Sequence, residues 1–578
     1  MNNNLKKLNK KLEEKEIDFF LISTTDEFLN EYVPARNMRL KWLINFSGSN
    51  GIALISRKEK YFFTDGRYIL QAKKEINKEF KIFDLALIDF FTFARDKIKK
   101  KTILVDFRIF KIDFMKKLFR VAESNSNKII HDKNNIIDRI WLNRPAEIIK
   151  NFFFLDKRIV GQNIYEKQRT LFKINDNDII IITSPESVCW FLNIRGFDLP
   201  HTPIVFSRAI ISRAEIKLFI DKEKVPEESF DIENLKIFQL KNFEEQIIRL
   251  PKNKRIFMDN MSSFYYYDFL VKRNFKPVIG TDPCKIIKSQ KNNSEIRWSR
   301  KAHLYDGVSL VKFFYWLDNE DFNIKVTEFY VSKKLENYRK EIKSFFSTSF
   351  PTISAVGANG SIIHYNPKKR SNRLEKGKLY LCDSGGQYYG GTTDVTRTIF
   401  LGDSKPNKEF ISNYTKVLLG HISISMMKFP EGTKGHQIDS IARYYLWQDG
   451  MDYNHGTGHG VGSFLGVHEG PQSISKRFNN FVLKEGMILS NEPGFYKRKK
   501  YGIRIENLVL VKKSRLKGFL EFETLTLFPY EHRLIDKSLL SDSHKKWINS
   551  YHERVYYRLS NFLSKHLRDW LKKKVKRI

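Results

Sequence analysis

Two acidic pairs are placed symmetrically about turns in the second half of the chain. In residues 379–400, two β-rich runs flank a glycine-studded turn, and a turn centred between Tyr388 and Tyr389 leaves Asp383 and Asp394 equidistant from it. Cross-strand neighbours in such a hairpin have Cβ atoms about 5 Å apart. Two carboxylates this close destabilise a hairpin unless a cation or a shared proton neutralises them.

The same arrangement occurs again in residues 488–511, where a polar turn centred near Lys499 joins two apolar strands. Glu492 and Glu506 are equidistant from that centre. One opposed acidic pair is typical of a solvated surface. Two such pairs on glycine-punctuated hairpins in one region indicate a site.

Three histidines, His455, His459 and His468, lie within a glycine-rich run between the two hairpins. A His-x3-His spacing on a helix would indicate zinc, but the flanking glycines disfavour a helix. A glycine-rich loop instead allows close backbone approach and can hold imidazoles at fixed angles. A single histidine is more often structural, whereas three amid this much glycine favour a site.

Four carboxylates and at least one imidazole form a hard, oxygen-rich ligand set that suits a pair of Mn²⁺, Co²⁺ or Zn²⁺ ions. Two such ions about 3.5–4 Å apart, sharing a water or hydroxide, form a hydrolytic centre. The residues by themselves therefore predict a dinuclear hydrolase.

The elements that must position these residues predict an α/β (α+β) chain of three domains, with boundaries at 1–146, 147–290 and 291–578. The first opens with a helical pattern and a strand at residues 18–23. The second repeats its plan: Trp, Asn and Gly recur at identical offsets in residues 42–48 and 190–196, which favours an internal duplication.

The third predicted domain begins with a long helix after a polar stretch at residues 285–294, and it ends in a helical extension. Apolar residues share one face of each helix. They are Leu304, Val308, Val311 and Tyr315 on the first, and Trp547, Tyr551, Val555 and Leu559 on the last. The last stripe is interpreted as core or subunit contact.

Composition further narrows the possible cellular locations and binding partners. The chain has 578 residues, 41% hydrophobic, three cysteines and a formal charge of +36. The sparse cysteines, the charged amino terminus and the lack of an apolar run of about 18 residues predict a cytoplasmic protein with no membrane partner. The basic residues are dispersed, which favours compositional bias over a nucleic-acid partner.

The quoted motifs resemble the metal-ligand motifs of the "pita-bread" peptidases, which include methionine aminopeptidase, prolidase, aminopeptidase P and creatinase. The likeness is greatest to the three-domain, cytosolic-type Xaa-Pro aminopeptidases. It extends to residues 64–68 and 193–196 in the amino-terminal half, which implies two creatinase-like domains before a pita-bread catalytic domain. The five ligands of the family fall on Asp383, Asp394, His459, Glu492 and Glu506.

The resemblance also implies roles. It predicts two divalent ions, most simply Mn²⁺, with Asp394 and Glu506 bridging and Glu492 accepting a proton. His364 and His468 match residues that contact the substrate carbonyl, and His455 and Arg504 match residues on the proline side of the pocket. Arg504 has an equally plausible reading as a charge partner that orients the bridging carboxylates.

The expected activity is removal of the first residue from peptides with proline second, by a homodimer. Methionine aminopeptidase lacks two such preceding domains, prolidase is restricted to dipeptides, and creatinase-like members are shorter. A non-catalytic binding module would have lost ligands that are all present here. A nucleic-acid-binding protein is the remaining alternative.

Overall fold

The computed structural model describes residues 3–227, 232–322 and 326–578. Residues 1 and 2, with which the first predicted domain starts, lie outside this description. Contacts divide the chain into two compact units, Met1–Leu155 with Gln162–Lys285, and Asp156–Gly161 with Ile286–Ile578. Each is described by itself. Within the described residues, no helix is long and apolar enough to cross a membrane.

The first unit contains a six-stranded sheet of order β4-β3-β2-β1-β5-β6. Its central strand β1 pairs antiparallel with β2 and parallel with β5. The strands are β1 (Phe19–Ser23), β2 (Ile52–Ile55), β3 (Lys60–Thr64), β4 (Lys81–Asp84), β5 (Thr102–Val105) and β6 (Lys128–His131). Helix α1 (Asn3–Glu14) buries one leucine face, as its pattern predicts.

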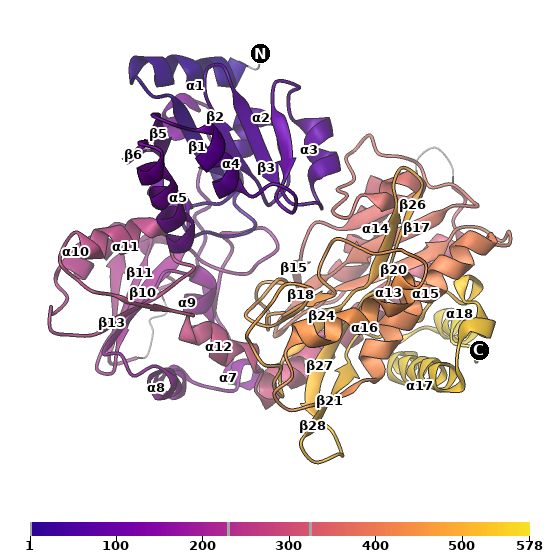
Figure 1. Cartoon of the computed structure of the whole chain (residues 1–578). Helices are drawn as coiled ribbons and strands as arrows, with labels where there is room; N and C mark the ends of the chain where they lie inside the picture. Colours follow the sequence, from indigo (N-terminus) through magenta and orange to yellow (C-terminus); the bar gives the residue numbers. More distant parts are fainter. Residues whose placement is uncertain (1–2, 228–231, 323–325) are drawn as a thin grey trace. The chain divides into compact units, whose positions relative to one another are not determined.

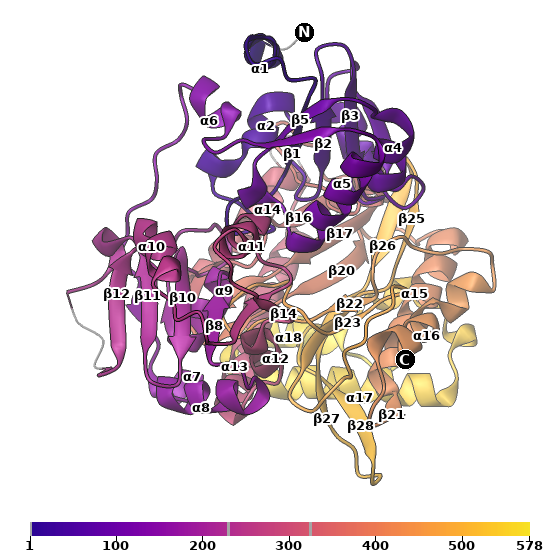
Figure 2. The same ribbon diagram turned by 60° about the vertical axis from the view of Figure 1, so that its left-hand side comes forward.

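A second sheet of the same unit, β12-β11-β10-β8-β13-β14, repeats this order (Figure 2). Its central strand β8 likewise pairs antiparallel with β10 and parallel with β13. The strands are β8 (Ile179–Ile182), β10 (Ser207–Ser212), β11 (Ile216–Ile220), β12 (Leu235–Gln239), β13 (Ile256–Asp259) and β14 (Val278–Gly280). The two sheets share one topology, as an internal duplication predicts.

The helices and the remaining strands of this unit surround the two sheets (Figure 1). The longer helices are α2 (Arg39–Ile44), α3 (Ile69–Glu75), α4 (Phe90–Lys97), α5 (Ile112–Ser124), α6 (Ile136–Ile140), α8 (Ile164–Ile174), α9 (Pro185–Phe191), α10 (Phe243–Ile248) and α11 (Phe264–Val271). The strands β7 (Phe153–Phe154) and β9 (Ile194–Arg195) form a short ladder.

The recurring asparagine of the duplicated motif has the same conformation in both copies. Asn45, which caps α2, has φ +66°, and Asn193, which follows α9, has φ +56°. Asparagine adopts this left-handed conformation more readily than other non-glycine residues. The recurring glycine is sterically required, because a Cβ at Gly48 would lie 2.4 Å from the Phe46 ring and one at Gly196 2.7 Å from Val205.

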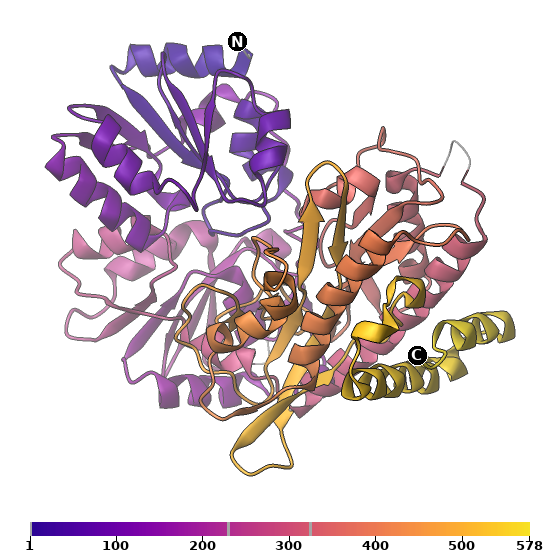
Figure 3. The same cartoon turned by 45° about the vertical axis from the view of Figure 1, so that its right-hand side comes forward.

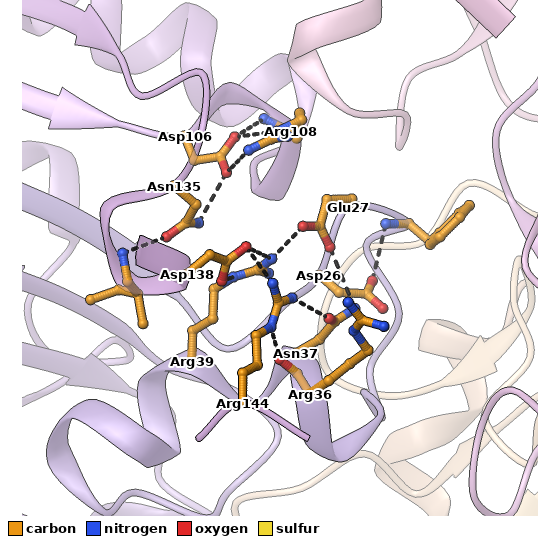
Figure 4. Close-up of polar contacts among 12 residues, drawn as sticks. Asp26, Glu27, Arg36, Asn37, Arg39, Asp106, Arg108, Asn135, Asp138 and Arg144 are labelled. Carbon is orange, nitrogen blue, oxygen red and sulfur yellow. Dashed lines mark hydrogen bonds and ion pairs between the residues drawn. The ribbon is translucent and has the colours of Figure 1, made fainter. Parts of the chain in front are cut away.

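A polar network occupies the first α/β repeat (Figure 4). Arg39, whose side chain is 1% exposed, donates to both oxygens of Asp138 at 2.7 and 2.8 Å and also pairs with Glu27. Arg144 approaches the same Asp138 at 2.8 Å. Burial alone would raise the pKa of Glu27, but Arg39 outweighs it and lowers that pKa to about 2. Arg39 is therefore the centre on which this network depends.

Replacing Arg39 by methionine should lower the free energy of unfolding by about 1–3 kcal/mol, because the half-buried carboxylates of Glu27 and Asp138 lose their partner. Denaturant unfolding measures this. The exposed pair Arg57–Glu13 provides a control, and Arg57→Met should change stability by less than about 1 kcal/mol. A carboxyl group whose pKa is lowered on folding stabilises the folded state at pH values above its unfolded pKa. This contribution is lost as the pH falls towards 2. The Arg39→Met deficit should therefore shrink below about pH 4; a constant deficit would contradict this account.

The second unit is organised on the long helix α13 (Asn293–Asn319), which confirms the helix expected after the polar stretch. The Asn292 side chain caps it by accepting from the backbone N–H of Ser294 and Glu295. Val308 and Val311 are buried on its inner face, and Leu304 packs against the same core. The polar stretch itself also contains a short helix, α12 (Pro283–Ser289).

The strands of the second unit form several small antiparallel sheets. Two of them, β16-β17-β20 and β21-β28-β27-β24, carry the longer strands. The strands are β15 (Phe345–Thr348), β16 (Ile353–Val356), β17 (Leu379–Ser384), β18 (Gly386–Tyr388), β19 (Gly391–Thr392), β20 (Val395–Phe400), β21 (Lys428–Pro430), β22 (Gly458–His459), β23 (Ser473–Ile474), β24 (Ile488–Asn491), β25 (Gly494–Lys497), β26 (Tyr501–Arg504), β27 (Asn507–Lys513) and β28 (Phe519–Thr524).

The other helices of this unit cover these sheets, and those of the carboxy terminus are yellow in Figure 3. They are α7 (Lys157–Val160), α14 (Glu328–Lys340), α15 (Lys408–Met426), α16 (Gly435–Trp447), α17 (Asp542–Leu559) and α18 (Lys565–Lys574). On α17, Tyr551, Val555 and Leu559 are buried in the main core, and Trp547 packs against it. The predicted apolar stripe is therefore core.

Candidate metal centre

The first acidic hairpin forms, but its register differs from the prediction by two residues. Asp383 lies opposite Thr396, and Tyr388 lies opposite Gly391. The turn is therefore centred between Tyr389 and Gly390 rather than between Tyr388 and Tyr389. A two-residue loop requires positive φ, which Gly390 supplies at +92°. Since side chains alternate with period two, a shift of two residues leaves Asp383 and Asp394 on one face as diagonal neighbours.

The second acidic hairpin has the predicted centre. Asn491 pairs with Asn507 and Gly494 with Arg504, so Lys499, with φ +59°, is the midpoint. Glu492 and Glu506 occupy the short gap between these two ladders. They are opposed across it, as expected.

The structure brings the two hairpins and the glycine-rich run to one place. One oxygen each from Asp394 and Glu506 and one nitrogen of His459 all lie within 4.8 Å of one another. His459 Nε2 is 3.6 Å from Asp394 Oδ2 and 3.5 Å from Glu492 Oε1. No helix forms around this histidine, which lies on the two-residue strand β22. The glycine-rich loop was therefore correctly predicted.

The ring of His459 is oriented as a ligand. Its Nδ1 lies 3.0 Å from the carbonyl oxygen of Gly460, to which it donates. This bond leaves Nε2 facing the carboxylates of Asp394 and Glu492. Burial alone would lower the pKa of His459, but these carboxylates raise it to about 9. A bound cation would take the place of the proton on Nε2. A neutral imidazole held in this way by a backbone carbonyl is the usual form of a metal-bound histidine.

The electrostatics of the carboxylates fit a bound cation. Burial raises the pKa of Asp383 to about 6, and it also raises the pKa values of Glu492 and Glu506, with neighbouring carboxylates adding to the effect. Among the described residues, Asp383 Oδ1 and Asp394 Oδ1 are buried without a hydrogen-bond partner. Divalent ions would satisfy these oxygens and remove the repulsion.

Arg504 contacts both Asp383 and Tyr496, and Tyr496 in turn contacts His455. Arg504 is 2% exposed, pairs with Asp383 Oδ2 and donates to the Tyr496 hydroxyl at 2.8 Å. Tyr496 lies 2.8 Å from His455 Nε2, and His455 Nδ1 lies 2.8 Å from Gly456 O. Arg504 is thus a charge partner of Asp383, whereas the sequence reading expected it to orient the bridging carboxylates of Asp394 and Glu506.

The other two predicted histidines lie on separate loops. The His468 ring packs edge-to-face on the His459 ring, with centroids 4.4 Å apart. His364 is half-buried in a turn after the 3-10 helix Gly357–Ser361. This 3-10 helix packs closely on β26, since a Cβ at Gly360 would lie 3.1 Å from Gly502 N.

Three polar residues of the site were missed from the sequence. Thr396 donates to Glu506 Oε2 at 2.7 Å, Ser490 donates to Glu492 Oε1 at 3.1 Å, and Tyr496 bonds Arg504. Strand alternation could have found them. Each lies two or four residues along the chain from a predicted ligand, Asp394 or Glu492, so side-chain alternation along the predicted hairpin places it on the same side.

Comparison with protein families and curated proteins gives consistent matches. Residues 297–513 match metallopeptidase family M24, and residues 518–578 match the C-terminal region of peptidase M24. Residues 4–140 and 143–295 each match a creatinase/prolidase N-terminal domain. A probable Xaa-Pro aminopeptidase P of Laccaria bicolor is 36% identical, with 98% of this chain and 92% of the relative covered. Xaa-Pro aminopeptidase 1 of Dictyostelium discoideum is 33% identical, with 99% and 96% covered.

Solved structures agree with these matches. X-prolyl aminopeptidase from Caenorhabditis elegans, described as a cytosolic enzyme with a di-nuclear active site, superposes with a TM-score of 0.95 at 31% identity. The match covers 100% of this chain and 99% of that one. The prolidase from Pyrococcus horikoshii gives a TM-score of 0.51 at 26% identity, covering 63% of this chain and 99% of that one.

Replacing Asp394 by asparagine should remove metal binding without unfolding the chain, because the substitution deletes a charge and opens no cavity. In the chelator-treated wild type, Mn²⁺ at about 100 times its Kd should stabilise by about 2.7 kcal/mol. Asp394→Asn should lose this rise in Tm, while the exposed Asp403→Asn should keep it. An Asp394→Asn protein that retains two metal ions and the full Tm rise would refute the ligand assignment.

Proposed function

The chain belongs to metallopeptidase family M24, and we propose that it is an Xaa-Pro aminopeptidase. It hydrolyses the first peptide bond of peptides with proline in the second position. The observation that carries this proposal is the convergence of two acidic hairpins and His459 on one site, in a chain that is similar over its whole length to such enzymes. Proline lacks the N–H that general peptidases hold, so its peptides require a specialist.

We assign Asp383, Asp394, His459, Glu492 and Glu506 as ligands of two divalent ions, with Mn²⁺ as the expected metal. When bound, the pair lowers the pKa of a water molecule so that hydroxide is available near neutral pH. The orphaned oxygens of Asp383 and Asp394 support this assignment. Within the site, Arg504 holds one oxygen of Asp383 and leaves the other available.

Glu492 is the proposed proton acceptor. Its side chain is 18% exposed, compared with 6% for Asp394, so it is the more accessible of the two carboxylates beside His459. Burial raises its pKa, which makes a carboxyl group better able to hold a proton during turnover. The hydroxyl of Ser490 fixes its Oε1 at 3.1 Å.

The histidines outside the ligand set bind the substrate in this proposal. His468, packed on His459, and His364 donate to the carbonyl oxygen of the scissile bond as negative charge develops there. His455 lines the proline side together with Arg504, and Tyr496 holds both in place. In this proposal Arg504 lines the proline side of the site and also serves as the charge partner of Asp383.

Three further expectations accompany the proposal. A cytoplasmic location is supported by the structural relative that is described as cytosolic. A homodimer remains a prediction from the family resemblance. The expectation of no nucleic-acid partner continues to depend on the dispersal of basic residues along the sequence.

The first test of the proposed function is substrate choice. Arg-Pro-Pro should lose its amino-terminal arginine, and Arg-Ala-Ala should be cleaved far more slowly, because only the first presents the proline ring and tertiary amide to the His455 side of the site. Chromatography of the products in the presence of Mn²⁺, with and without chelator, gives kcat/KM for both. Equal kcat/KM values for the two peptides would contradict the proline specificity and indicate a general aminopeptidase.

A second test separates chemistry from metal binding. His364→Ala should keep both metal ions, since His364 is outside the proposed ligand set. Its kcat should fall about 100- to 1000-fold, the loss expected when a hydrogen-bond donor to the developing negative charge is removed. A purely structural histidine would instead lower stability by about 1–3 kcal/mol with kcat per folded molecule unchanged. Metal content, Tm and single-turnover rate distinguish these results. His436→Ala, which removes a half-buried histidine of α16, is the control and should leave kcat unchanged.

A further inference from the structure

Three charged side chains are buried together beside the glycine-rich loop. Lys291 Nζ donates to Glu469 Oε1 at 2.9 Å, and Lys288 Nζ lies 2.5 Å from Glu469 Oε2. The side chains of Lys291, Lys288 and Glu469 are 0%, 2% and 1% exposed, respectively. Burial would raise the pKa of Glu469, but the two ammonium groups lower it to about 2, so the carboxylate is charged.

Such a cluster is poorly explained by stability alone. Removing each charge from water costs several kcal/mol, and well-packed apolar residues often stabilise as much as a buried ion pair. What an ion pair adds is a fixed geometry with defined donors and acceptors. The question is therefore which part of the site this geometry holds.

The lysines belong to a fixed part of the second unit. Lys288 lies on α12, and the backbone N–H of Lys291 donates to Gly486 O at 2.9 Å just before α13 begins. On the loop side, Gly462 leaves room for the carboxylate, because a Cβ there would be 2.7 Å from Glu469 Oε2. The Glu469 side chain thus ties a glycine-rich loop to a rigid helix start.

Glu469 also adjoins the catalytic side of the loop. It directly follows His468, whose ring packs on His459 at 80°. Its backbone N–H donates to Gly460 O at 2.8 Å, and the same oxygen accepts from His459 Nδ1 at 3.0 Å. The segment that carries His468 is therefore held by the carboxylate on one side and by the His459 strand on the other.

We propose that Glu469 is a positioning residue, anchored by Lys288 and Lys291, that sets the place of the His468 ring in the active site. This inference rests on the proposed function, since it assigns His468 a role in turnover. The backbone bond to Gly460 does not require the Glu469 side chain. Loss of the anchor therefore displaces His468 and leaves the orientation of His459 intact.

The test uses the variant Glu469→Gln/Lys291→Met. In the wild type the three side chains sum to +1 (two lysines and one glutamate), and in the variant Lys288 alone gives +1. The net charge is therefore matched, while the carboxylate that both lysines contact is removed. With Arg-Pro-Pro, kcat should fall about 10- to 100-fold, as expected for a displacement of about 1 Å, and KM should change less than about threefold. Mn²⁺ affinity, measured by calorimetry on chelator-treated protein, should change less than about threefold, since the Gly460 carbonyl that orients His459 is a backbone group that the variant leaves in place.

The matched control is Asp198→Asn/Lys224→Met in the first unit, where a lysine–carboxylate pair is 1% and 2% exposed. It disturbs an equally buried pair and should leave kcat per folded molecule unchanged. An equal fall of kcat in both variants would overturn the proposal. If Glu469→Gln/Lys291→Met does not fold, Glu469→Asp, which keeps the charge but shortens the reach, takes its place with the same expected signs.

A double-mutant cycle with His468→Ala decides whether Glu469 acts through this histidine. Once His468 is absent, loss of the anchor should cause no further fall in kcat, so the two effects should be strongly non-additive. Additive effects, or a Mn²⁺ affinity that falls along with kcat, would overturn the proposal. Failure of the wild type to cleave Arg-Pro-Pro would instead refute the proposed function.

Discussion

Mutual repulsion among carboxylates is the constraint on which the catalytic unit is built. Asp383, Asp394 and Glu506 are buried, Glu492 is half-buried beside them, and burial raises the pKa of three of the four. A fold that collects such groups must hold them rigidly and must supply positive charge. Arg504 supplies one such charge to Asp383, and we propose that two divalent ions supply the rest.

The backbone meets this constraint with features that look incidental in the sequence. Gly390 closes a two-residue turn at φ +92°, and Lys499 sits at the midpoint of the second hairpin with φ +59°. Around these turns, hydroxyls placed two residues from a ligand fix the carboxylate oxygens, as Thr396 does for Glu506. Behind the glycine-rich loop, Glu469 and its two lysines hold the neighbouring His468 segment. The residues of the site are thus held in place by tight turns, hydrogen bonds and ion pairs arranged around one centre.

Much of the fold and site could be predicted because its signals are local. Helix and strand periodicity located α1, β1 and α13, the recurring Trp, Asn and Gly indicated the duplication, and symmetry about Lys499 gave the second hairpin its register. The first hairpin was misplaced by two residues because turn type depends on which residue adopts positive φ. The pairing of Lys288 with Glu469, 181 positions apart in the chain, had no local signal and required the tertiary structure. The division at residues 146 and 147 stays a prediction.

We propose that this site holds a pair of metal ions rather than one ion or a set of shared protons. Electron paramagnetic resonance of the Mn²⁺-loaded protein, combined with metal analysis, tests it most directly. Two ions about 3.5–4 Å apart through bridging carboxylates should be magnetically coupled at a stoichiometry of two per chain. Two ions per chain with a coupled spectrum would support the account. The six-line spectrum of isolated Mn²⁺ at full occupancy, or one ion per chain with full activity, would contradict it.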